Sequence, residues 1–261
     1  MNDLFRKIRS RSVEIFSLIG FVCLWEFLAV FVVRDALYLP GFHDVALAFV
    51  DLLGDPGLYA DMGVSLRHFL SGAAAAIIVG IPVGILMGWF PQLSRCFNPI
   101  VEILRPIPPL AWIPFAIIWF KLTHEAAAMI IFIGMVFPII VNTYTGFRNV
   151  PKIYVEAAKV LGCLKNVNLI RYVAIPAASP MILSGIRISM GIGWMCLASA
   201  EMFGVSSAGI GYKIWFWYGL HRMELVVVYM LILGLLGLFI DILFRNVVEK
   251  RMLKWQAGTV I

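Results

Sequence analysis

The sequence predicts an all-helical integral membrane protein with about six transmembrane helices. Hydrophobic residues make up 62 % of the 261 residues and charged residues only 14 %, whereas soluble domains carry roughly 25 % charged residues. A globular protein of this size could not bury so much apolar surface, so part of it must face lipid. The apolar residues also form long runs, and the Lys and Arg residues cluster in the short segments between these runs.

Six apolar segments are long enough to cross a bilayer, because a helix needs about 20 residues to span roughly 30 Å of hydrocarbon. Their approximate limits are 13–33, 66–90, 99–120, 126–147, 181–203 and 225–244. The first segment follows four basic residues but is longer than the apolar core of a signal peptide. We therefore expect it to remain in the mature protein as a helix.

The positions of the positive charges predict the orientation of the chain. Most of the 21 Lys and Arg residues lie before the first span, in the turn at Arg95, between the fourth and fifth spans, and in the C-terminal tail. Because cytoplasmic loops are enriched in these residues, both termini are expected in the cytoplasm. In the opposite loop, 34–65, a short helix is expected at 45–53 with a scaffolding role, since four apolar residues recur at helical spacing: Val45, Leu47, Ala48 and Leu52.

Small residues recur at every fourth position in two predicted spans. The second span contains Ala76, Gly80, Gly84 and Gly88, and the fifth contains Gly185, Ser189 and Gly193. Such a stripe lets a neighbouring helix approach closely, so it predicts helix packing. The sequence has no internal repeat, and residues 1–261 are interpreted as a single transmembrane domain.

The longest predicted cytoplasmic segment, 148–180, is too long to be a simple connector between two helices. Pro151 suits a first helical position, and Gly162 supplies a break at which a positive φ is tolerated. A second short helix is expected at 166–173, stopped before the membrane by Pro176 and Pro180.

The first of these two short helices has an apolar face made of Ile153, Ala157, Val160 and Leu161. Two interpretations are compatible with this face. The segment either docks into a groove of a soluble partner or packs against itself. Physical reasoning alone does not favour one over the other.

Particular residues give this segment a resemblance to a known family. Glu156, Ala157, Ala158, Gly162, Ile175 and Pro176 resemble the EAA loop of permease subunits of ATP-binding-cassette (ABC) importers. Three further stretches resemble the nitrate/sulfonate/taurine/bicarbonate branch of these permeases: 104–114, 185–187 and 200–202. The similarity covers nearly the whole chain. One departure is that Gly162 and Pro176 are one residue further apart than in that branch.

The resemblance implies the fold of a type I ABC importer permease in the cell (inner) membrane. It also implies that two identical copies form the pathway and that 148–180 is the coupling segment for cytoplasmic ATP-binding subunits. An extracytoplasmic binding protein is expected to deliver a small, anionic solute. ATP would be bound by the separate subunit, in agreement with the lack of a GxxxxGK[ST] loop here. The alternative function is an ion-coupled secondary transporter or channel subunit. No nucleophile–base pair is recognisable, so the chain is not expected to be an enzyme or to need a cofactor.

Ionisable residues within apolar spans are candidates for function, because burying a charge in the bilayer is costly. These are Glu26, Glu102, Arg105, Arg187, Glu201 and Asp241. Glu102 and Arg105 are three apart, so they could simply pair across one helical turn. The prolines of the third span break its helix, and broken backbone is tolerated where it lines a wet cavity. Arg105 and Pro108 are therefore candidate pathway-lining residues.

One face of the fifth span combines charged, small and aromatic residues. Arg187, Trp194 and Glu201 lie on it with Gly191 and Ala198, and we take the first three as further pathway candidates. An arginine suits an anionic solute, although Arg187 is close enough to the span's end to extend its charge to the interface instead.

Other functions are excluded by simple patterns. The basic residues do not form a stripe with aromatic residues, so nucleic-acid binding is not expected. The four cysteines lack CxxC spacing and are expected to be small buried residues. The four histidines do not cluster in the sequence, so no metal site is expected.

Overall fold

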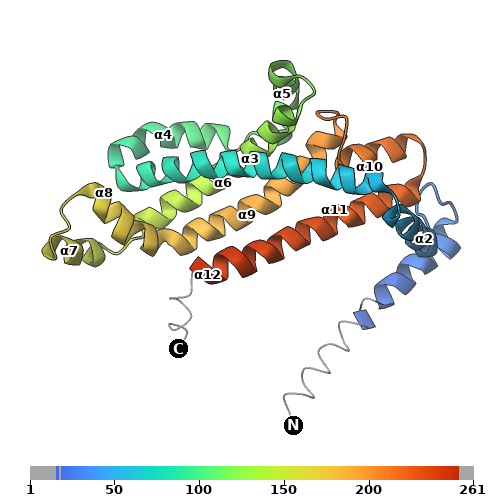
Figure 1. The fold of residues 1–261 in the computed structure, drawn as a ribbon, viewed down its shortest axis with the longest axis horizontal. Coiled ribbons are helices and arrows are strands. Elements are labelled where there is room, and N and C mark those ends of the chain that lie inside the picture. The colour runs from blue at the N-terminus through green and yellow to red at the C-terminus, as the bar shows by residue number, and fades with distance from the viewer. Residues whose placement is uncertain (1–15, 18, 253–261) are drawn as a thin grey trace, which may run out of the picture. The chain divides into compact units, whose positions relative to one another are not determined.

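The computed structural model describes residues 16–17 and 19–252, and its regular structure over these ranges is helical, with no β-strand (Figure 1). The predicted all-helical fold is confirmed. The helices belong to two compact units. The first contains the described residues up to Ala60 together with Lys213–Ile232, and the second contains Asp61–Tyr212 and the described residues from Leu233 onward.

Four helical stretches within the described residues are long and apolar enough to cross a membrane. They are Pro56–Trp89, His124–Arg148, Asn166–Met202 and Met223–Val248, and they contain α3 (Pro56–Trp89), α6 (His124–Arg148), α9 (Ile175–Met202) and α11 (Met223–Phe244). A bent pair of helices makes a fifth span if counted as one. The first predicted span corresponds to a shorter apolar helix, Ile19–Val33, and positions 13–15 lie outside the described residues.

In the first unit, polar contacts join this apolar helix to the next one, α2 (Phe42–Leu53). The indole N–H of Trp25 donates to the carbonyl of Pro40 at 3.1 Å. The carboxylate of Glu26 accepts the backbone N–H of Phe42 at 2.6 Å and lies 2.7 Å from Nδ1 of His43. The carboxylate therefore satisfies one free backbone N–H at the start of α2 and contacts the His43 ring, which accounts for one of the charges predicted within a span.

The short helix predicted at 45–53 is confirmed as α2, although it begins three residues earlier. Val45 and Leu52 are buried, whereas Leu47 is 66 % exposed. The first unit also contains most of α10 (Ile210–Gly219) and the start of α11.

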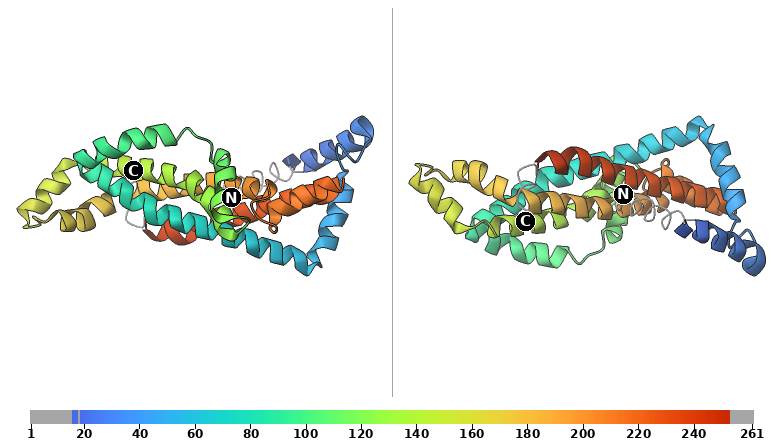
Figure 2. Two further views of the ribbon diagram at one scale, coloured as in Figure 1. Left: turned by 90° about the horizontal axis from the view of Figure 1, so that it is seen from above. Right: turned by 90° about the horizontal axis from the view of Figure 1, so that it is seen from below.

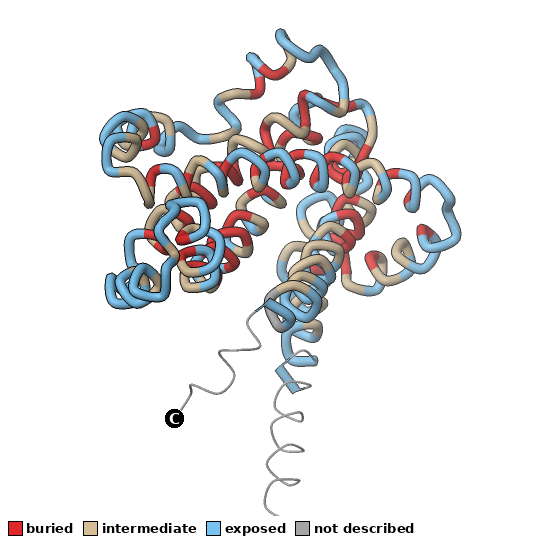
Figure 3. Tube along the Cα trace, turned by 60° about the vertical axis from the view of Figure 1, so that its left-hand side comes forward, coloured by how far each residue is buried: buried red, intermediate tan, exposed pale blue. Residues whose placement is uncertain are grey.

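In the second unit, α3, α6 and α9 pack closely through glycines. A Cβ atom built on Gly80, Gly84 or Gly88 of α3 would lie 2.9, 2.5 or 2.4 Å from a side-chain atom of α6. On α9, a Cβ atom on Gly185 would lie 2.5 Å from Asn142, and one on Gly193 would lie 2.5 Å from Met135. Both predicted stripes of small residues therefore serve helix packing. The two helices α6 and α9 lie side by side (Figure 2), and the buried core runs along them (Figure 3).

Prolines break the third predicted span, as expected. Helix α4 (Pro91–Leu104) is followed by a 3₁₀ turn, η2 (Pro109–Trp112), and by α5 (Ile113–Phe120). The two parts of this span, Pro91–Leu104 and Pro109–Phe120, meet at 88°. Arg105 and Pro108 lie in the exposed connection between them. Glu102 does not pair with Arg105, which corrects that prediction: it accepts a hydrogen bond from Asn98, one turn earlier on the same helix, at 2.8 Å.

The prediction that Pro176 and Pro180 stop a short helix before the membrane is wrong. Helix α8 (Asn166–Leu169), a π-helical turn η3 (Ile170–Ala174) and α9 form one continuous span. The wider turn η3 precedes Pro176, which lies in the first turn of α9. Pro180 leaves the carbonyl of Pro176 without its backbone donor, and the hydroxyl of Ser179 donates to that oxygen at 2.8 Å instead. The helix therefore continues through both prolines.

Candidate functional site

The predicted coupling segment forms an exposed helical hairpin in the second unit, built from α7 (Lys152–Val160) and α8. Pro151 is the N-cap of α7 rather than its first residue, a shift of one position. At the other end, Gly162 has a φ of +90°. Its N–H donates to the carbonyl of Lys159, and the N–H of Cys163 donates to that of Ala158. This pair of bonds is a Schellman motif, so the break predicted at Gly162 is confirmed.

The hairpin exposes its apolar face. Of the residues predicted to form it, Ile153 is 66 %, Val160 88 % and Leu161 87 % exposed. No residue of α7 is buried (Figure 3). Glu156, Ala157 and Ala158 lie on this helix, whereas Ile175 and Pro176 lie at the start of α9. The helix contacts η3, the turn that leads directly into α9. The second unit itself therefore leaves this apolar surface uncovered.

A fully buried carboxylate lies at the opposite end of α9. Glu201 is 0 % exposed and accepts three kinds of hydrogen bond: from the hydroxyl of Ser65 at 2.9 Å, from the backbone N–H of Gly211 at 2.8 Å, and from the ring of His68, whose Nδ1 lies 2.8 Å away. His68 is also 0 % exposed. The other ring nitrogen of His68 lies 2.6 Å from Nδ1 of His124, which is only partly buried. An imidazole pair thus connects the buried carboxylate to a more accessible position.

The loop after α9 is shaped around this carboxylate. Gly209 has a φ of +119°, and a Cβ atom there would lie 2.5 Å from the carboxylate of Glu201. The N–H of Ile210 donates to the hydroxyl of Ser65 at 2.8 Å. The polar side-chain atoms of Ser65, His68 and Glu201 therefore each have a hydrogen-bond partner, as their burial requires. We call Ser65, His68, His124 and Glu201 the Glu201 cluster.

The Glu201 cluster corrects the expectation that the histidines lie apart. It also adds Ser65, His68 and His124, which the sequence analysis did not select as site residues. His68 and His124 are in contact although they are 56 positions apart. They meet because α3 and α6 pack together, which sequence spacing does not show. Within the described residues, no group of three or more His, Cys, Asp or Glu side chains has the arrangement of a metal site. The signal that could have drawn attention to this place is the Gly209–Gly211 pair following a charged residue in an apolar helix.

A second site joins α9 to α11. The guanidinium of Arg187 forms two hydrogen bonds to the carboxylate of Asp241, at 2.9 and 3.1 Å. The indole of Trp194 donates to the carbonyl of Leu233 at 3.0 Å. Arg187, Gly191, Trp194 and Asp241 line a cavity of about 410 Å³. Three residues of the predicted face of the fifth span therefore do line one cavity, and Asp241 is a partner that the sequence analysis left unassigned.

The residues predicted to share one face of the fifth span nevertheless belong to two separate sites. Arg187 and Trp194 line the cavity beside α11, whereas Glu201 is enclosed in its own cluster. Arg105 and Pro108 lie in the exposed connection after α4 and line neither of these sites. The structure thus brings together only some of the candidate pathway residues within one chain.

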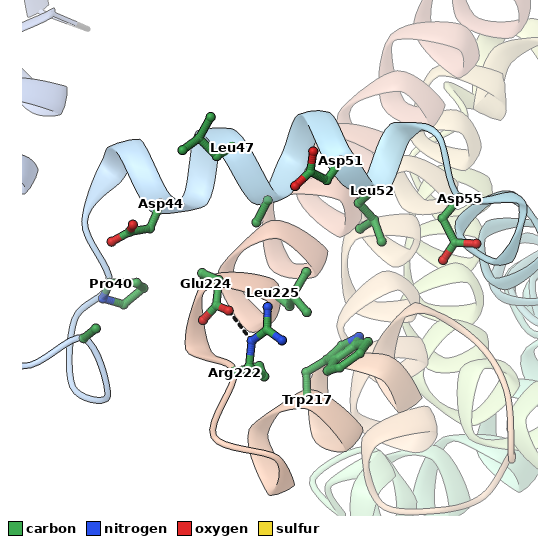
Figure 4. A pocket seen from close by; sticks show the side chains of 12 residues that line it. Pro40, Asp44, Leu47, Asp51, Leu52, Asp55, Trp217, Arg222, Glu224 and Leu225 are labelled. Atoms are coloured by element: carbon green, nitrogen blue, oxygen red, sulfur yellow. Dashed lines mark hydrogen bonds and ion pairs between the residues drawn. The ribbon is translucent and has the colours of Figure 1, made fainter.

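The first unit has an acidic cavity of about 630 Å³. Figure 4 shows Asp44, Asp51 and Asp55 along one side, with Trp217 and an ion pair between Arg222 and Glu224 on the other. Most of its charges are negative, so it is unsuited to a small anion. It lies on the loop predicted to be outside the cell and on the turn between α10 and α11.

The sequence and fold are similar to those of known transport proteins. Residues 80–254 match the family described as binding-protein-dependent transport system inner membrane component. A putative ABC transporter permease protein of Methanocaldococcus jannaschii is 41 % identical over 88 % of this chain and 86 % of its own length. The bicarbonate transport system permease protein CmpB of Synechococcus elongatus is 34 % identical over 90 % of this chain and 87 % of its own length.

Among solved structures, a chain of the MetNI methionine ABC transporter in an inward-facing conformation matches with a TM-score of 0.55 and 21 % identity. The match covers 71 % of this chain and 94 % of that chain, and it supports the fold alone. The resemblance to ABC importer permeases is therefore confirmed, as are the type I permease fold and the location in the membrane. In this family ATP is bound by a separate subunit. The chain belongs to the binding-protein-dependent transport system inner membrane component family and is a permease subunit of an ABC importer rather than an enzyme.

Proposed function

We propose that this chain forms the pathway of an ATP-driven importer for a small anion, which an extracytoplasmic binding protein delivers. In this proposal two copies of the chain enclose the pathway, and the hairpin of α7 and α8 docks into cytoplasmic ATP-binding subunits. Both termini and the hairpin lie in the cytoplasm.

The observation that carries the proposal is the uncovered apolar face of α7. Large apolar side chains are normally left exposed in a contiguous patch only where another surface covers them. Ile153, Val160 and Leu161 are all more than half exposed, while the Schellman motif at Gly162 fixes the end of the helix. A short, well-capped helix with an open apolar side fits the helix-in-groove mode of recognition.

Two further observations support an anionic solute. CmpB, a relative of similar length, is a bicarbonate permease by name. Arg187 lines a cavity in a span, and arginine presents a planar set of donors to oxyanions. Its carboxylate partner Asp241 already occupies part of that set, so we assign the pathway role jointly to Arg187, Trp194 and the broken segment with Arg105 and Pro108. Glu201 supports this pathway from its buried cluster.

Docking is tested by co-purification with the ATP-binding subunit of the same importer. Glu156→Lys and Gly162→Pro should each lose that subunit, because the first reverses a charge on α7 and the second destroys its C-terminal cap. Glu102→Lys makes the same charge reversal at an exposed position on α4, outside the hairpin, so it serves as the control and should retain the subunit. Full retention in both Glu156→Lys and Gly162→Pro would contradict the docking role.

Energy coupling is tested with proteoliposomes that contain the complete importer. Uptake should require ATP hydrolysis and should fall when either Arg105 or Arg187 is changed to glutamine. Unchanged uptake in both variants would remove the pathway assignment. Full-rate uptake by this chain alone, driven only by an ion gradient, would instead favour a secondary transporter.

The orientation is tested with the native cysteines. The expectation that all four cysteines are buried is wrong, because only Cys196 is buried. Cys163 is partly exposed in the hairpin, and Cys96 is exposed on α4, near the turn at Arg95. A membrane-impermeant maleimide should label both in inverted vesicles and neither in right-side-out vesicles. The opposite pattern would place the hairpin outside and contradict the proposal.

A further inference from the structure

A positively charged cavity of about 300 Å³ lies in the second unit at the turn between α3 and α4. Its polar lining consists of Arg95 and Ser94 from the first turns of α4, and Tyr144 and Arg148 from the last turns of α6. No acidic side chain lines it. Its volume is at the lower end of the range of small-molecule sites.

The close packing of α3 against α6 holds these groups in place. A Cβ atom on Gly88, in the last turn of α3, would lie 2.4 Å from Cβ of Phe147. This contact brings the end of α6, with Tyr144 and Arg148, beside the end of α3. The chain then reverses at Phe90, whose backbone is extended, and α4 begins at Pro91. The arginines therefore come from helices whose ends are fixed by packing.

The positive charges of the cavity are not neutralised by a carboxylate. Nη1 of Arg148 donates to the hydroxyl of Tyr144 at 2.5 Å, which uses only one of the five N–H groups of a guanidinium. Ser94 donates weakly to the same hydroxyl, at 3.4 Å. Arg95 makes neither a hydrogen bond nor an ion pair with any residue in the described part of the chain. Two guanidinium groups and two hydroxyls thus line one space, and no acidic side chain of the described residues lines it with them.

This donor set matches a particular ligand chemistry. Guanidinium groups bind phosphate oxygens through pairs of parallel hydrogen bonds, and hydroxyl groups supply further donors. Basic pockets between transmembrane helices typically receive the headgroups of anionic phospholipids. We propose that this cavity binds a phosphate group, supplied either by an anionic phospholipid or by soluble phosphate.

An occupant would connect two parts of the chain with different tasks. Arg95 belongs to α4, the first half of the broken span, and Arg148 is the last residue of α6 before the hairpin. A phosphate held by both arginines would fix the end of α6 relative to α4. The binding step itself does not depend on the transported solute or on ATP, so its test is independent of the proposed function.

The test measures binding to the full-length protein, purified in a neutral detergent and phosphate-free buffer. The probes are dioctanoyl phosphatidylglycerol, dioctanoyl phosphatidylcholine as the neutral control, and inorganic phosphate, each titrated while thermal unfolding is followed. Arg95→Gln and Arg148→Gln should each weaken binding of the active probe about tenfold, the loss expected for one charge-assisted hydrogen bond. Arg171→Gln removes an exposed arginine outside the cavity and should leave the affinity unchanged.

The pattern across probes identifies the source of the phosphate. A response to phosphatidylglycerol without a response to inorganic phosphate assigns a lipid headgroup. Inorganic phosphate that binds and displaces phosphatidylglycerol assigns soluble phosphate. Absence of saturable binding by either probe overturns the proposal. Equal weakening in Arg171→Gln, or unchanged affinity in both cavity variants, also overturns it. Since the side chain of Arg95 makes no hydrogen bond to another described residue, Arg95→Gln remains informative even if Arg148→Gln fails to fold.

Discussion

Replacing Glu201 with alanine should strongly destabilise the second unit. Three buried donors point at its carboxylate: the hydroxyl of Ser65, the ring of His68 and the backbone N–H of Gly211. A buried donor left without a partner costs about 1–3 kcal/mol, and breaking a buried charged network by removing one partner costs about 3–5 kcal/mol. These penalties overlap, so we expect Glu201→Ala to lower the free energy of unfolding by about 4 kcal/mol.

The measurement is heat- or urea-induced unfolding of the purified protein in detergent, followed by tryptophan fluorescence. Glu201→Gln retains the volume and one acceptor but turns an N–H₂ group toward a donor, so a smaller loss of about 2 kcal/mol is expected. Glu102→Ala is the matched control, because Glu102 is exposed and accepts one hydrogen bond, from Asn98. If the free energy of unfolding of Glu201→Ala lay within about 0.5 kcal/mol of that of this control, the reasoning on the buried network would be refuted.

Three further predictions concern helix packing, the hairpin and pH. Gly84→Val should lower the free energy of unfolding by about 1–3 kcal/mol, measured in the same unfolding assay, because its Cβ would lie 2.5 Å from that of Thr143. Gly162→Ala should raise amide hydrogen exchange at the C-terminal end of α7, since an alanine at a φ of +90° is strained by about 1 kcal/mol or more; unchanged exchange would contradict this. The hydrogen bond to Glu26 raises the pKa of His43 above its ordinary value of 6.5. The His43–Glu26 pair therefore contributes its full stabilisation below pH 6.5, and this stabilisation is lost as the pH rises through the raised pKa of His43. His43→Asn should abolish this pH dependence of the unfolding temperature, and an identical dependence in the variant would exclude His43 as its cause.

The sequence predicted most of the membrane-spanning segments and the first helix of the hairpin, because these follow from local patterns. A run of about 20 apolar residues predicts a span wherever its neighbours lie, and α6 and α11 match their predicted segments closely. The positive φ at Gly162 and the glycine stripes are equally local signals. Each depends on residues within a few turns of one helix.

The Glu201 cluster could not be predicted in the same way, because its members are far apart in the chain. Ser65 and Glu201 are separated by 136 positions, and His68 and Glu201 by 133. Only the packing of α3 against α6 and α9 brings them together. The continuation of the helix through Pro180 was missed for a different reason. A single side chain, Ser179, supplies the missing donor, and propensity rules do not include such rescue.

The unbroken run from Asn166 to Met202 has a mechanical consequence. At about 1.5 Å per residue, its 37 residues form a rod of roughly 55 Å, with the hairpin contact at one tip and the buried carboxylate at the other. A displacement of α7 would therefore be transmitted along a continuous helix to its other end. The regular α-helical hydrogen bonding along this run changes at the π-helical turn η3 and at Pro180, where Ser179 supplies the missing donor, so a pivot would form near these points.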